Sequence, residues 1–240
     1  MNETVTLLEN KLKHKNEELE QFIYIVSHDV KAPLRAINNL VGWIEDEIGD
    51  YDNNVTEYFK LLKGRVNRID SMMNALTELS RVRRLELEHT ETNVGKLIQD
   101  IIDIIPDKKN ISIEIDKMPV FRTMQSKLFK VLYALIHNAF RFHTNDKNGW
   151  IKIKCTENTD SYLFEIIDNG PGIEVQYHQK VFSVFYTLNS KDVSETTGAG
   201  LTIASAIVDF AGSKLNLESN PGQGSNFNFL WPKSEILLKN

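Results

Sequence analysis

The sequence predicts an α+β protein in two parts, a long helical N-terminal third followed by a sandwich of helices on a mixed sheet. Two observations lead to this fold class. Before about residue 84 the apolar residues recur every three or four positions, which is the period of amphipathic helices. After it, short alternating stretches typical of strands are interspersed with longer helical stretches, which favours a sheet with helices on one face. With 240 residues, 25% of them charged, the chain is long enough to bury a core.

The first helix carries a heptad seam with a single polar interruption. A single stripe of this kind cannot bury itself, so it predicts a parallel coiled-coil homodimer. In this register Val26 takes position a and His28 position c, which turns the histidine away from the seam and toward solvent. The seam positions are Val5, Leu8, Leu12, Lys15, Leu19, Phe22 and Val26.

The apolar period continues past Pro33, so we expect one helix that bends at the proline. Residues 49–54 form a polar turn signal, and a second amphipathic stretch runs from Val55 to Leu76. Two helices joined by a short turn predict a hairpin, and the two hairpins of a dimer predict a four-helix bundle. A purely structural coiled-coil dimer fits the same periodicity.

The character of the sequence changes near Arg83, where we place the domain boundary. The next helix is expected to begin after Asn93, whose side chain can cap it. The helices predicted in this part are 94–105, 125–142 and 201–210, and the strands are 111–115, 151–156, 162–167, 214–218 and 226–231.

Composition and charge exclude several classes of function. A net charge of −5 without a dominant basic cluster argues against nucleic acid as a partner. Cys155 is the single cysteine, so neither a disulfide framework nor a cysteine-based metal cage is expected. No apolar run reaches the roughly 18 residues that span a bilayer. We expect a cytoplasmic location, for the chain itself or as the cytosolic portion of a longer, membrane-associated protein.

The first candidate for chemistry lies in the stretch from Ser27 to Leu34. Here His28 stands beside Asp29 in a strongly helical context. A neutral imidazole is a nucleophile near neutral pH, and an adjacent carboxylate can accept the proton on its other nitrogen. A solvated helix face accounts for the pair as well.

Further candidates lie in the second part of the chain. Asp168 to Ile173 follows a strand directly, so that glycines there let the backbone approach a ligand and the carboxylate can accept a hydrogen bond from an exocyclic amine. Thr197 to Leu201 precedes a helix, whose free amides suit an anion. Asn138 offers a hard oxygen ligand for Mg²⁺, with Arg141 one turn later to meet phosphate. Alone, each segment also fits an ordinary turn or a solvated polar face.

No Gly-rich phosphate loop of the common nucleotide-binding folds is present in the sequence. Six segments instead resemble, in family order, the motifs of two-component sensor histidine kinases, which join a phosphotransfer hairpin to a Bergerat-type ATPase domain of the GHKL superfamily. They are the H-box at 27–34, the N-box at 135–142, and the G1, F, G2 and G3 boxes at 168–173, 181–186, 197–201 and 221–225.

The resemblance implies a homodimer that uses ATP and Mg²⁺ and passes a phosphoryl group to the receiver domain of a response regulator. It implies a coiled-coil signalling linker at 1–22, a dimerisation and histidine phosphotransfer hairpin at 23–84, and a catalytic ATP-binding domain at 85–240. The sensor domain that would act on the linker is missing from this chain. A chaperone or topoisomerase ATPase of the same superfamily would not place a heptad hairpin with a histidine before the N-box.

The family roles carry over to individual residues. His28 would receive the phosphoryl group with the help of Asp29, Asn138 would coordinate Mg²⁺, and Asp168 would bind the adenine amine. Phe182 and Phe185 would pack at the base of a lid running from about Tyr186 to Thr197, although two aromatics three apart also suit a plain core. The expected nucleotide-binding residues are Asn138, Arg141, Phe142, Asp168, Gly170, Gly172, Ile173, Phe182, Phe185, Thr197, Gly198, Ala199, Gly200 and Leu201.

Three positions depart from the family pattern. Ala134 stands where the N-box usually has an earlier asparagine, and Thr196 where the G2 box usually begins with glycine. Both changes remove contacts to metal or phosphate, so the alternative function is a catalytically impaired dimeric scaffold for phosphotransfer and nucleotide binding. Ala32 replaces the Thr or Asn that orients water in kinases that also act as phosphatases. We therefore expect weak phosphatase activity, and efficient dephosphorylation of a cognate phosphorylated regulator would contradict this.

Overall fold

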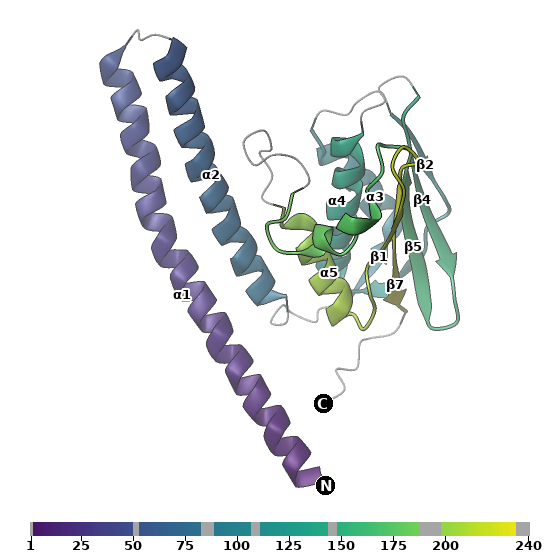
Figure 1. The fold of residues 1–240 in the computed structure, drawn as a ribbon. Helices are drawn as coiled ribbons and strands as arrows, with labels where there is room; N and C mark the ends of the chain where they lie inside the picture. Colours follow the sequence, from purple (N-terminus) through teal and green to yellow (C-terminus); the bar gives the residue numbers. More distant parts are fainter. Residues whose placement is uncertain are drawn as a thin grey trace. The chain divides into compact units, whose positions relative to one another are not determined.

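The computed structural model describes residues 2–49, 53–82, 89–106, 111–143, 148–187 and 198–233. They form two compact units, one made of the N-terminal helices and the other of the sheets and the remaining helices (Figure 1). Within the first helix, the side chains of the heptad positions Val5, Leu8 and Leu12 lie outside the described part. No helix in the described ranges is long and apolar enough to cross a membrane.

The first unit is a helical hairpin of α1 (Asn2–Ile48) and α2 (Asn53–Arg81). α1 continues through Pro33, although the proline has no backbone N–H to donate to the preceding turn. The side chains of Leu34 and Val41, seven residues apart on α1, are buried where the two helices pack together. The heptad period therefore predicted both helices and their pairing.

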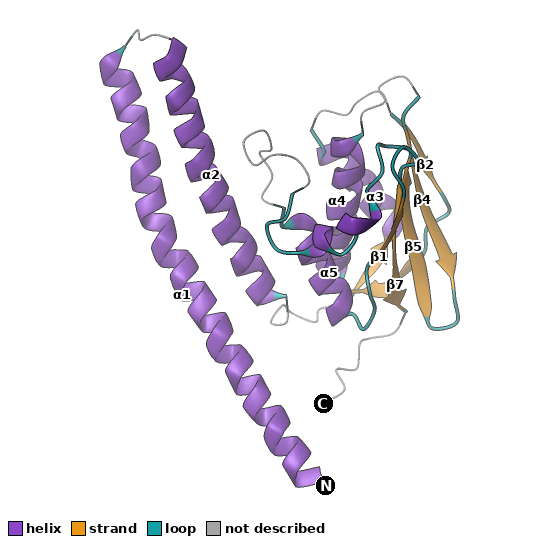
Figure 2. Ribbon diagram, viewed as in Figure 1, coloured by secondary structure: helices purple, strands orange, loops and turns teal. Residues whose placement is uncertain are grey.

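The second unit is an α/β sandwich with a five-stranded sheet in the order β2-β4-β5-β7-β6. β2 and β4 pair in parallel and the other neighbours are antiparallel. The helices lie on one face of this sheet (Figure 2). The elements are β1 (Thr90–Asn93), α3 (Val94–Ile104), β2 (Ser112–Ile115), β3 (Val120–Thr123), α4 (Gln125–Phe142), β4 (Trp150–Glu157), β5 (Ser161–Asp168), η1 (Val175–Tyr177), η2 (Lys180–Phe182), α5 (Gly200–Phe210), β6 (Asn216–Ser219) and β7 (Ser225–Pro232).

The core of the sandwich lies between the sheet and α3, α4 and α5. Alternate residues of the central strands point into it, and Phe164 on β5 pairs with Phe229 on β7 with ring centroids 5.4 Å apart. On the helix side Lys127 is fully buried, with its Nζ 3.3 Å from the ring centroid of Phe210 on α5. Burial lowers the pKa of Lys127 to about 8, with a smaller effect from the charge of Lys130.

The predicted α+β fold is confirmed, and the range 125–142 of α4 is as expected. Asn93 caps α3, because its Oδ1 accepts a hydrogen bond of 3.0 Å from the backbone N of Lys96. Two strands were missed. β1 and β3 pair into a small antiparallel sheet, and each has four residues, too few for an alternating pattern to stand out.

Candidate functional site

His28 and Asp29 form the first part of the candidate site, on α1. The Nδ1 atom of His28 lies 3.2 Å from Oδ1 of Asp29, and the two side chains are 70% and 71% exposed. A carboxylate oxygen only accepts, so Nδ1 carries the hydrogen of this contact. The lone pair of the neutral ring is then on Nε2, which makes Nε2 the nucleophilic nitrogen.

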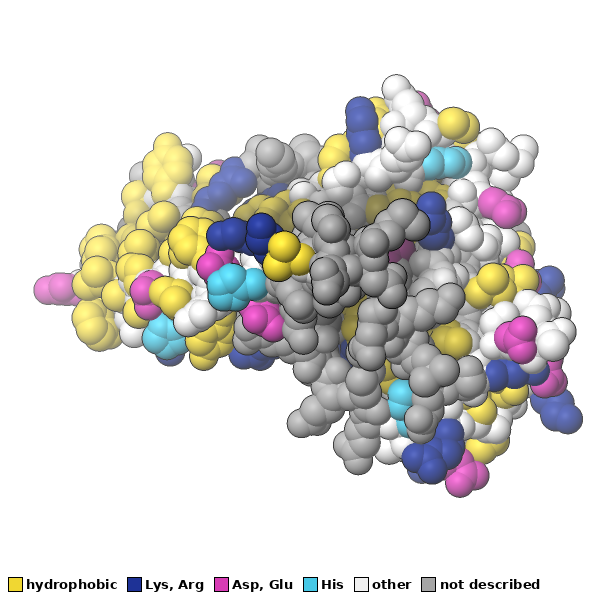
Figure 3. Space-filling view, turned by 90° about the horizontal axis from the view of Figure 1, so that it is seen from below, with side chains coloured by type: hydrophobic (Ala, Val, Ile, Leu, Met, Phe, Trp, Pro, Cys, Tyr) yellow, Lys and Arg dark blue, Asp and Glu magenta, His cyan; other side chains and the backbone are white. Residues whose placement is uncertain are grey.

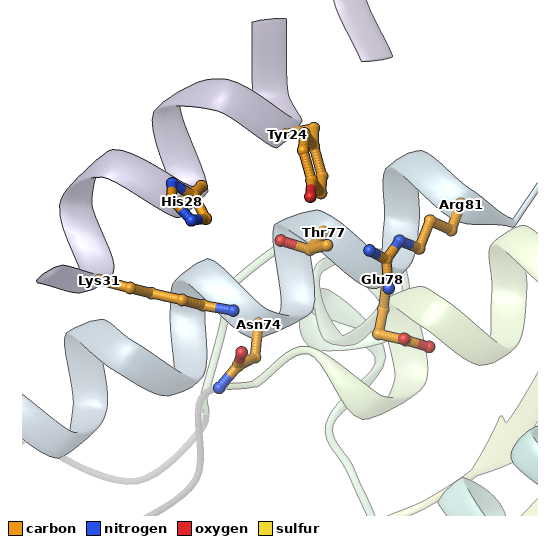
Figure 4. Close-up of a pocket in the computed structure, with 7 residues that line it drawn as sticks. All are labelled: Tyr24, His28, Lys31, Asn74, Thr77, Glu78 and Arg81. Carbon is orange, nitrogen blue, oxygen red and sulfur yellow. The ribbon is translucent and has the colours of Figure 1, made fainter. Parts of the chain in front are cut away.

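A polar groove of about 420 Å³ runs beside His28 (Figure 4). From α1, the side chain of Lys31 extends toward α2 across it (Figure 4). The guanidinium of Arg81 on α2 lies 5.8 Å from the ring centroid of Tyr24 on α1. The groove thus places two cationic side chains, Lys31 and Arg81, and the acidic Glu78 beside the histidine. Its lining residues are Tyr24, His28, Lys31, Asn74, Thr77, Glu78 and Arg81.

The exposed apolar side chains of α1 lie on its other flank. At about 100° of rotation per residue, Ile37 and Ile44 lie on the opposite side of the buried Leu34–Val41 seam from His28. They are 42% and 45% exposed. Hydrophobic side chains gather over the hairpin at the left of Figure 3. The stripe consists of Leu19, Phe22, Val26, Ile37, Leu40, Ile44 and Ile48 on α1, with Leu61, Leu62 and Ile69 on α2.

Asp168, at the end of β5, is the centre of the second part of the site. Its side chain is 8% exposed, and Oδ1 accepts a hydrogen bond of 2.8 Å from the backbone N of Gly170. Burial raises the pKa of the Asp168 carboxyl, while backbone hydrogen bonds from Gly170 and Ser225 and the charge of His143 act in the opposite direction. The carboxylate is therefore fixed in place, as a specific acceptor requires.

Two glycines bring the turn after β5 against the turn before β7. Gly172 has a φ of 71°, and a Cβ built there would overlap the carbonyl oxygen of Asn220. Gly224 has a φ of 82°, and a Cβ built there would overlap the carbonyl oxygen of Asp168. Both contacts are possible only without a side chain. The G1 and G3 segments, about fifty residues apart in sequence, therefore pack backbone to backbone beside the carboxylate.

The hydroxyl of Ser219, which no sequence motif indicated, supports these turns. Ser219 is buried, accepts a hydrogen bond of 2.8 Å from the backbone N of Ile173, and donates one of 2.7 Å to the carbonyl of Gly224. Its Oγ also lies 3.0 Å from that of Ser225. Serine at the end of a short strand carries no distinctive signal, so only the tertiary structure reveals this role.

α4 presents its polar residues near its C-terminal end. Asn138 is half-buried, Arg141 is exposed, and the Arg141 guanidinium lies 5.8 Å from the ring centroid of Phe142, which is 38% exposed. Burial lowers the pKa of the neighbouring His137, with a smaller effect from Arg141.

The described residues include no group of three or more His, Cys, Asp or Glu side chains able to hold a metal ion. The side-chain oxygen of Asn138 is a hard donor of the kind that Mg²⁺ accepts alongside phosphate oxygens and water. A dedicated protein cage among the described residues does not fit.

α5 begins beside α4. Its N-cap Ala199 is buried and makes no side-chain capping hydrogen bond, so the first amides of the helix are not satisfied by a cap. A Cβ built at Gly200 would lie 3.9 Å from the Cβ of Ala134 on α4. Ala134, which stands where the N-box usually has an asparagine, thus lies next to the N-terminal end of α5. Leu201, the second residue of α5, is half-buried.

The aromatic residues of the F-box directly precede the segment that is expected to form a lid. Phe182 packs edge-on against Phe227 of β7, with ring centroids 6.4 Å apart, so it belongs to the core as well. Phe185 has a φ of 63°, a backbone conformation that is unusual for a large side chain. Gly198, with a φ of 68°, lies against the carbonyl of Tyr186. Of the expected lid from about Tyr186 to Thr197, residues 188–197 lie outside the described residues, and they include Thr196 and Thr197.

Comparisons with known proteins match both units. Residues 18–85 match the family described as His Kinase A (phospho-acceptor) domain. Residues 123–235 match the family described as Histidine kinase-, DNA gyrase B-, and HSP90-like ATPase. A phospho-acceptor domain followed by such an ATPase domain is the domain pair of the sensor histidine kinases. The chain belongs to the sensor histidine kinases, and the predicted family is confirmed.

The chain is similar over nearly its whole length to parts of longer signalling proteins. It is 33% identical over 227 residues to cyanobacterial phytochrome B of Nostoc sp., covering 91% of this chain and 30% of that protein. It is 29% identical over 234 residues to phytochrome-like protein Cph1 of Synechocystis sp., covering 96% of this chain and 31% of that protein. The chain thus spans about a third of the length of these relatives.

Solved structures show the same fold. Full-length ShkA in complex with AMPPNP superposes with a TM-score of 0.66 at 18% identity, covering 91% of this chain and 47% of that one. The histidine kinase ThkA in complex with the response regulator TrrA superposes with a TM-score of 0.63 at 22% identity, covering 97% of this chain and 68% of that one.

Proposed function

We propose that this chain autophosphorylates on His28 with ATP and Mg²⁺ and passes the phosphoryl group to an aspartate of a response regulator. The observation that carries the proposal is the contact between Nδ1 of His28 and Asp29 on the exposed, polar flank of α1. It fixes the tautomer with a free nucleophilic lone pair on a histidine that a second domain can reach. The family of the chain supplies the ATP-binding domain.

The forward step forms a bond between Nε2 of His28 and the γ-phosphorus while the bond from that phosphorus to the ADP oxygen breaks. Asp29 keeps its hydrogen bond to Nδ1–H and stabilises the positive charge that develops on the ring. Lys31 and Arg81, which line the same groove, attract the transferred group. When bound, Mg²⁺ neutralises charge on the phosphates.

At the nucleotide, each expected residue has a distinct task. Asp168 accepts a hydrogen bond from the adenine amine, Asn138 ligates Mg²⁺, and the amides at Gly200 meet the phosphates. The buried position of Asp168 and the backbone contacts at Gly172 support this assignment. The methyl group of Ala134 makes no contact with metal or phosphate, so we expect turnover to be slow.

The two flanks of the hairpin suit two partners. The exposed apolar stripe favours a second copy of this chain, because packing it against the same stripe of a partner hairpin would bury it. The polar groove and its continuation along Lys31, Arg35, Asn38 and Asp70 remain open on the other flank. We propose that the receiver domain docks there, beside His28. ThkA, which has the same fold, forms a complex with the response regulator TrrA.

Incubating the chain with labelled ATP and Mg²⁺ tests the proposal. We expect acid-labile, base-stable label on the protein, as a phosphorylated histidine gives, and its transfer to a receiver domain. Nucleotide binding without label would favour the second candidate function, a phosphotransfer and nucleotide-binding scaffold, which the alanine at position 134 favours.

Acidification is expected to weaken ADP binding at a higher pH than it would with an ordinary aspartate. Burial raises the pKa of Asp168, against the opposing effects of Gly170, Ser225 and His143. The ionised carboxylate accepts the hydrogen bond of the adenine amine and the protonated acid does not, so affinity is constant above the pKa and falls as pH drops through it.

The dissociation constant of ADP should be measured from about pH 7.5 down to about pH 4.5. The Asp168→Asn variant is the control, because it shares the titration of the nucleotide itself but has no carboxylate at this position. Wild-type and variant curves that fall in parallel would contradict the assignment of Asp168 to the adenine amine.

A further inference from the structure

Two polar side chains, His143 and Asn169, join the end of α4 to the turn that carries Asp168. His143 directly follows the last residue of α4 and is 1% exposed. Its Nε2 lies 2.8 Å from Oδ1 of Asn169, the residue after Asp168. The motifs of the sequence do not single out this contact, and the nucleotide chemistry described above does not use it.

Backbone groups fix the direction of this hydrogen bond. The Oδ1 atom of Asn169 accepts a hydrogen bond of 2.7 Å from the backbone N of Trp150, and its Nδ2 donates one of 2.9 Å to the carbonyl of Asn148. These two contacts define which end of the amide is oxygen. An oxygen only accepts, so His143 is the donor through Nε2–H.

The contact borders directly on the Asp168 turn. The backbone N of Gly170 donates to Oδ1 of Asp168 over 2.8 Å. A Cβ built at Gly170 would lie 2.7 Å from that carboxylate oxygen and 3.9 Å from the Cα of His143. The backbone of His143 therefore closes the space on one side of the turn, while its ring holds the side chain of the next residue.

We propose that His143 and Asn169 form a latch that positions the Asp168 carboxylate for the adenine amine and ties it to α4, the helix that carries Asn138. In this role His143 is a positioning residue, because it acts on the nucleotide only through Asp168. The inference rests on the proposed function, in which Asp168 binds adenine.

Loss of the latch should weaken recognition of the adenine amine more than binding of the rest of the nucleotide. Without the imidazole, the Trp150 amide is the one donor to the Asn169 oxygen that remains among the described residues, and a cavity opens beside the turn. A hydrogen bond to a charged acceptor depends strongly on distance and angle, and a good one contributes about a tenfold preference or more. Loss of the latch should therefore reduce the preference for a nucleotide that carries the adenine amine over one that lacks it.

The test compares two ligands that differ only in this amine, ADP and purine riboside 5′-diphosphate, with the full chain. We expect the wild-type chain to prefer ADP by about tenfold or more in dissociation constant, measured by calorimetry at neutral pH. His143→Ala should reduce this preference by about tenfold. His143→Gln should retain most of it, since the amide nitrogen of glutamine can donate from nearly the same place as Nε2.

Thr123→Val is the matched control, because it also removes one buried hydrogen bond from the same domain. The Oγ1 atom of Thr123 accepts a bond of 2.7 Å from Nε1 of Trp231. Ser225 is the register partner of Asp168, and Trp231 lies six residues further along β7. The distance along the strand from Ser225 to Trp231 is therefore about 20 Å. We expect this variant to lower thermal stability without changing the preference for ADP.

The outcomes separate the latch from the proposed function. Equal weakening of both nucleotides in His143→Ala, an unchanged preference, or a glutamine variant that behaves like alanine would each overturn the latch while leaving ATP binding intact. A wild-type chain that binds neither nucleotide would overturn the proposed function, and the latch with it.

Discussion

Replacing His28 with glutamine is expected to abolish acid-labile labelling of the protein by ATP. Glutamine has nearly the length of histidine and a similar helix propensity, so the hairpin should fold, but its amide nitrogen is not a nucleophile. The label should fall to background, a loss of at least about a hundredfold, while the dissociation constant of ADP stays unchanged. The measurement combines labelling, acid lability and nucleotide binding on the same preparation.

His14 provides a matched control on the same helix. It is also exposed and also lies beside a carboxylate, with its Nε2 3.2 Å from Oε1 of Glu18. The His14→Gln variant should label like the wild type, because its site lacks the groove that adjoins His28. Asp29→Asn should label about tenfold to a hundredfold more slowly, since it keeps the shape of the side chain but removes the charge that stabilises the ring.

Label that survives in His28→Gln would assign the phosphoryl group to another residue. Label lost equally in His14→Gln would indicate that the helix, and not the nucleophile, was damaged. An unlabelled wild-type chain that still binds ADP would favour the scaffold.

The exposure of His28 was predictable from the sequence because it depends only on helix geometry. A regular helix turns by about 100° per residue, so the register that puts Val26 at position a determines which way a histidine at position 28 must point. For the same reason the apolar period gave the range of α4, whose buried residues recur every three or four positions.

The supports of Asp168 were not predictable in this way. Ser219 and His143 reach the turn from elements that are remote in sequence, and they act through side-chain hydrogen bonds that have no local signature. The residue types at positions 143 and 219 belong to no periodic pattern. Both contacts depend on how the strands of the sheet and the end of α4 are brought together in the folded domain. The G1 motif therefore identified the carboxylate, whereas the structure was needed to show what holds it.

A methyl group at Gly172 is expected to destabilise the catalytic domain and abolish nucleotide binding. The residue has a φ of 71°, which costs a non-glycine residue about 1–2 kcal/mol. In addition, the new Cβ would overlap the carbonyl oxygen of Asn220, a backbone atom that cannot move without shifting the turn before β7. Overpacking of this kind typically costs a further 1–3 kcal/mol or so.

Gly212→Ala isolates the first of these effects, the strain of the backbone conformation. Gly212 has a φ of 82°, but no atom lies within 4 Å of a Cβ built there, so its variant should show only the strain of the backbone conformation. In urea unfolding monitored by tryptophan fluorescence, we expect Gly172→Ala to lose about 3 kcal/mol or more and Gly212→Ala about 1–2 kcal/mol.

The two variants should also differ at the nucleotide. Gly212→Ala should bind ADP like the wild type, whereas Gly172→Ala should not bind it even at temperatures where the domain is still folded. The reason is that the turn carrying Asp168 can relieve the overlap with Asn220 only by moving away from it, and this movement displaces the carboxylate. Equal stability losses in the two variants, or normal ADP binding by folded Gly172→Ala, would show that the backbone contact between the two turns does not shape the adenine site.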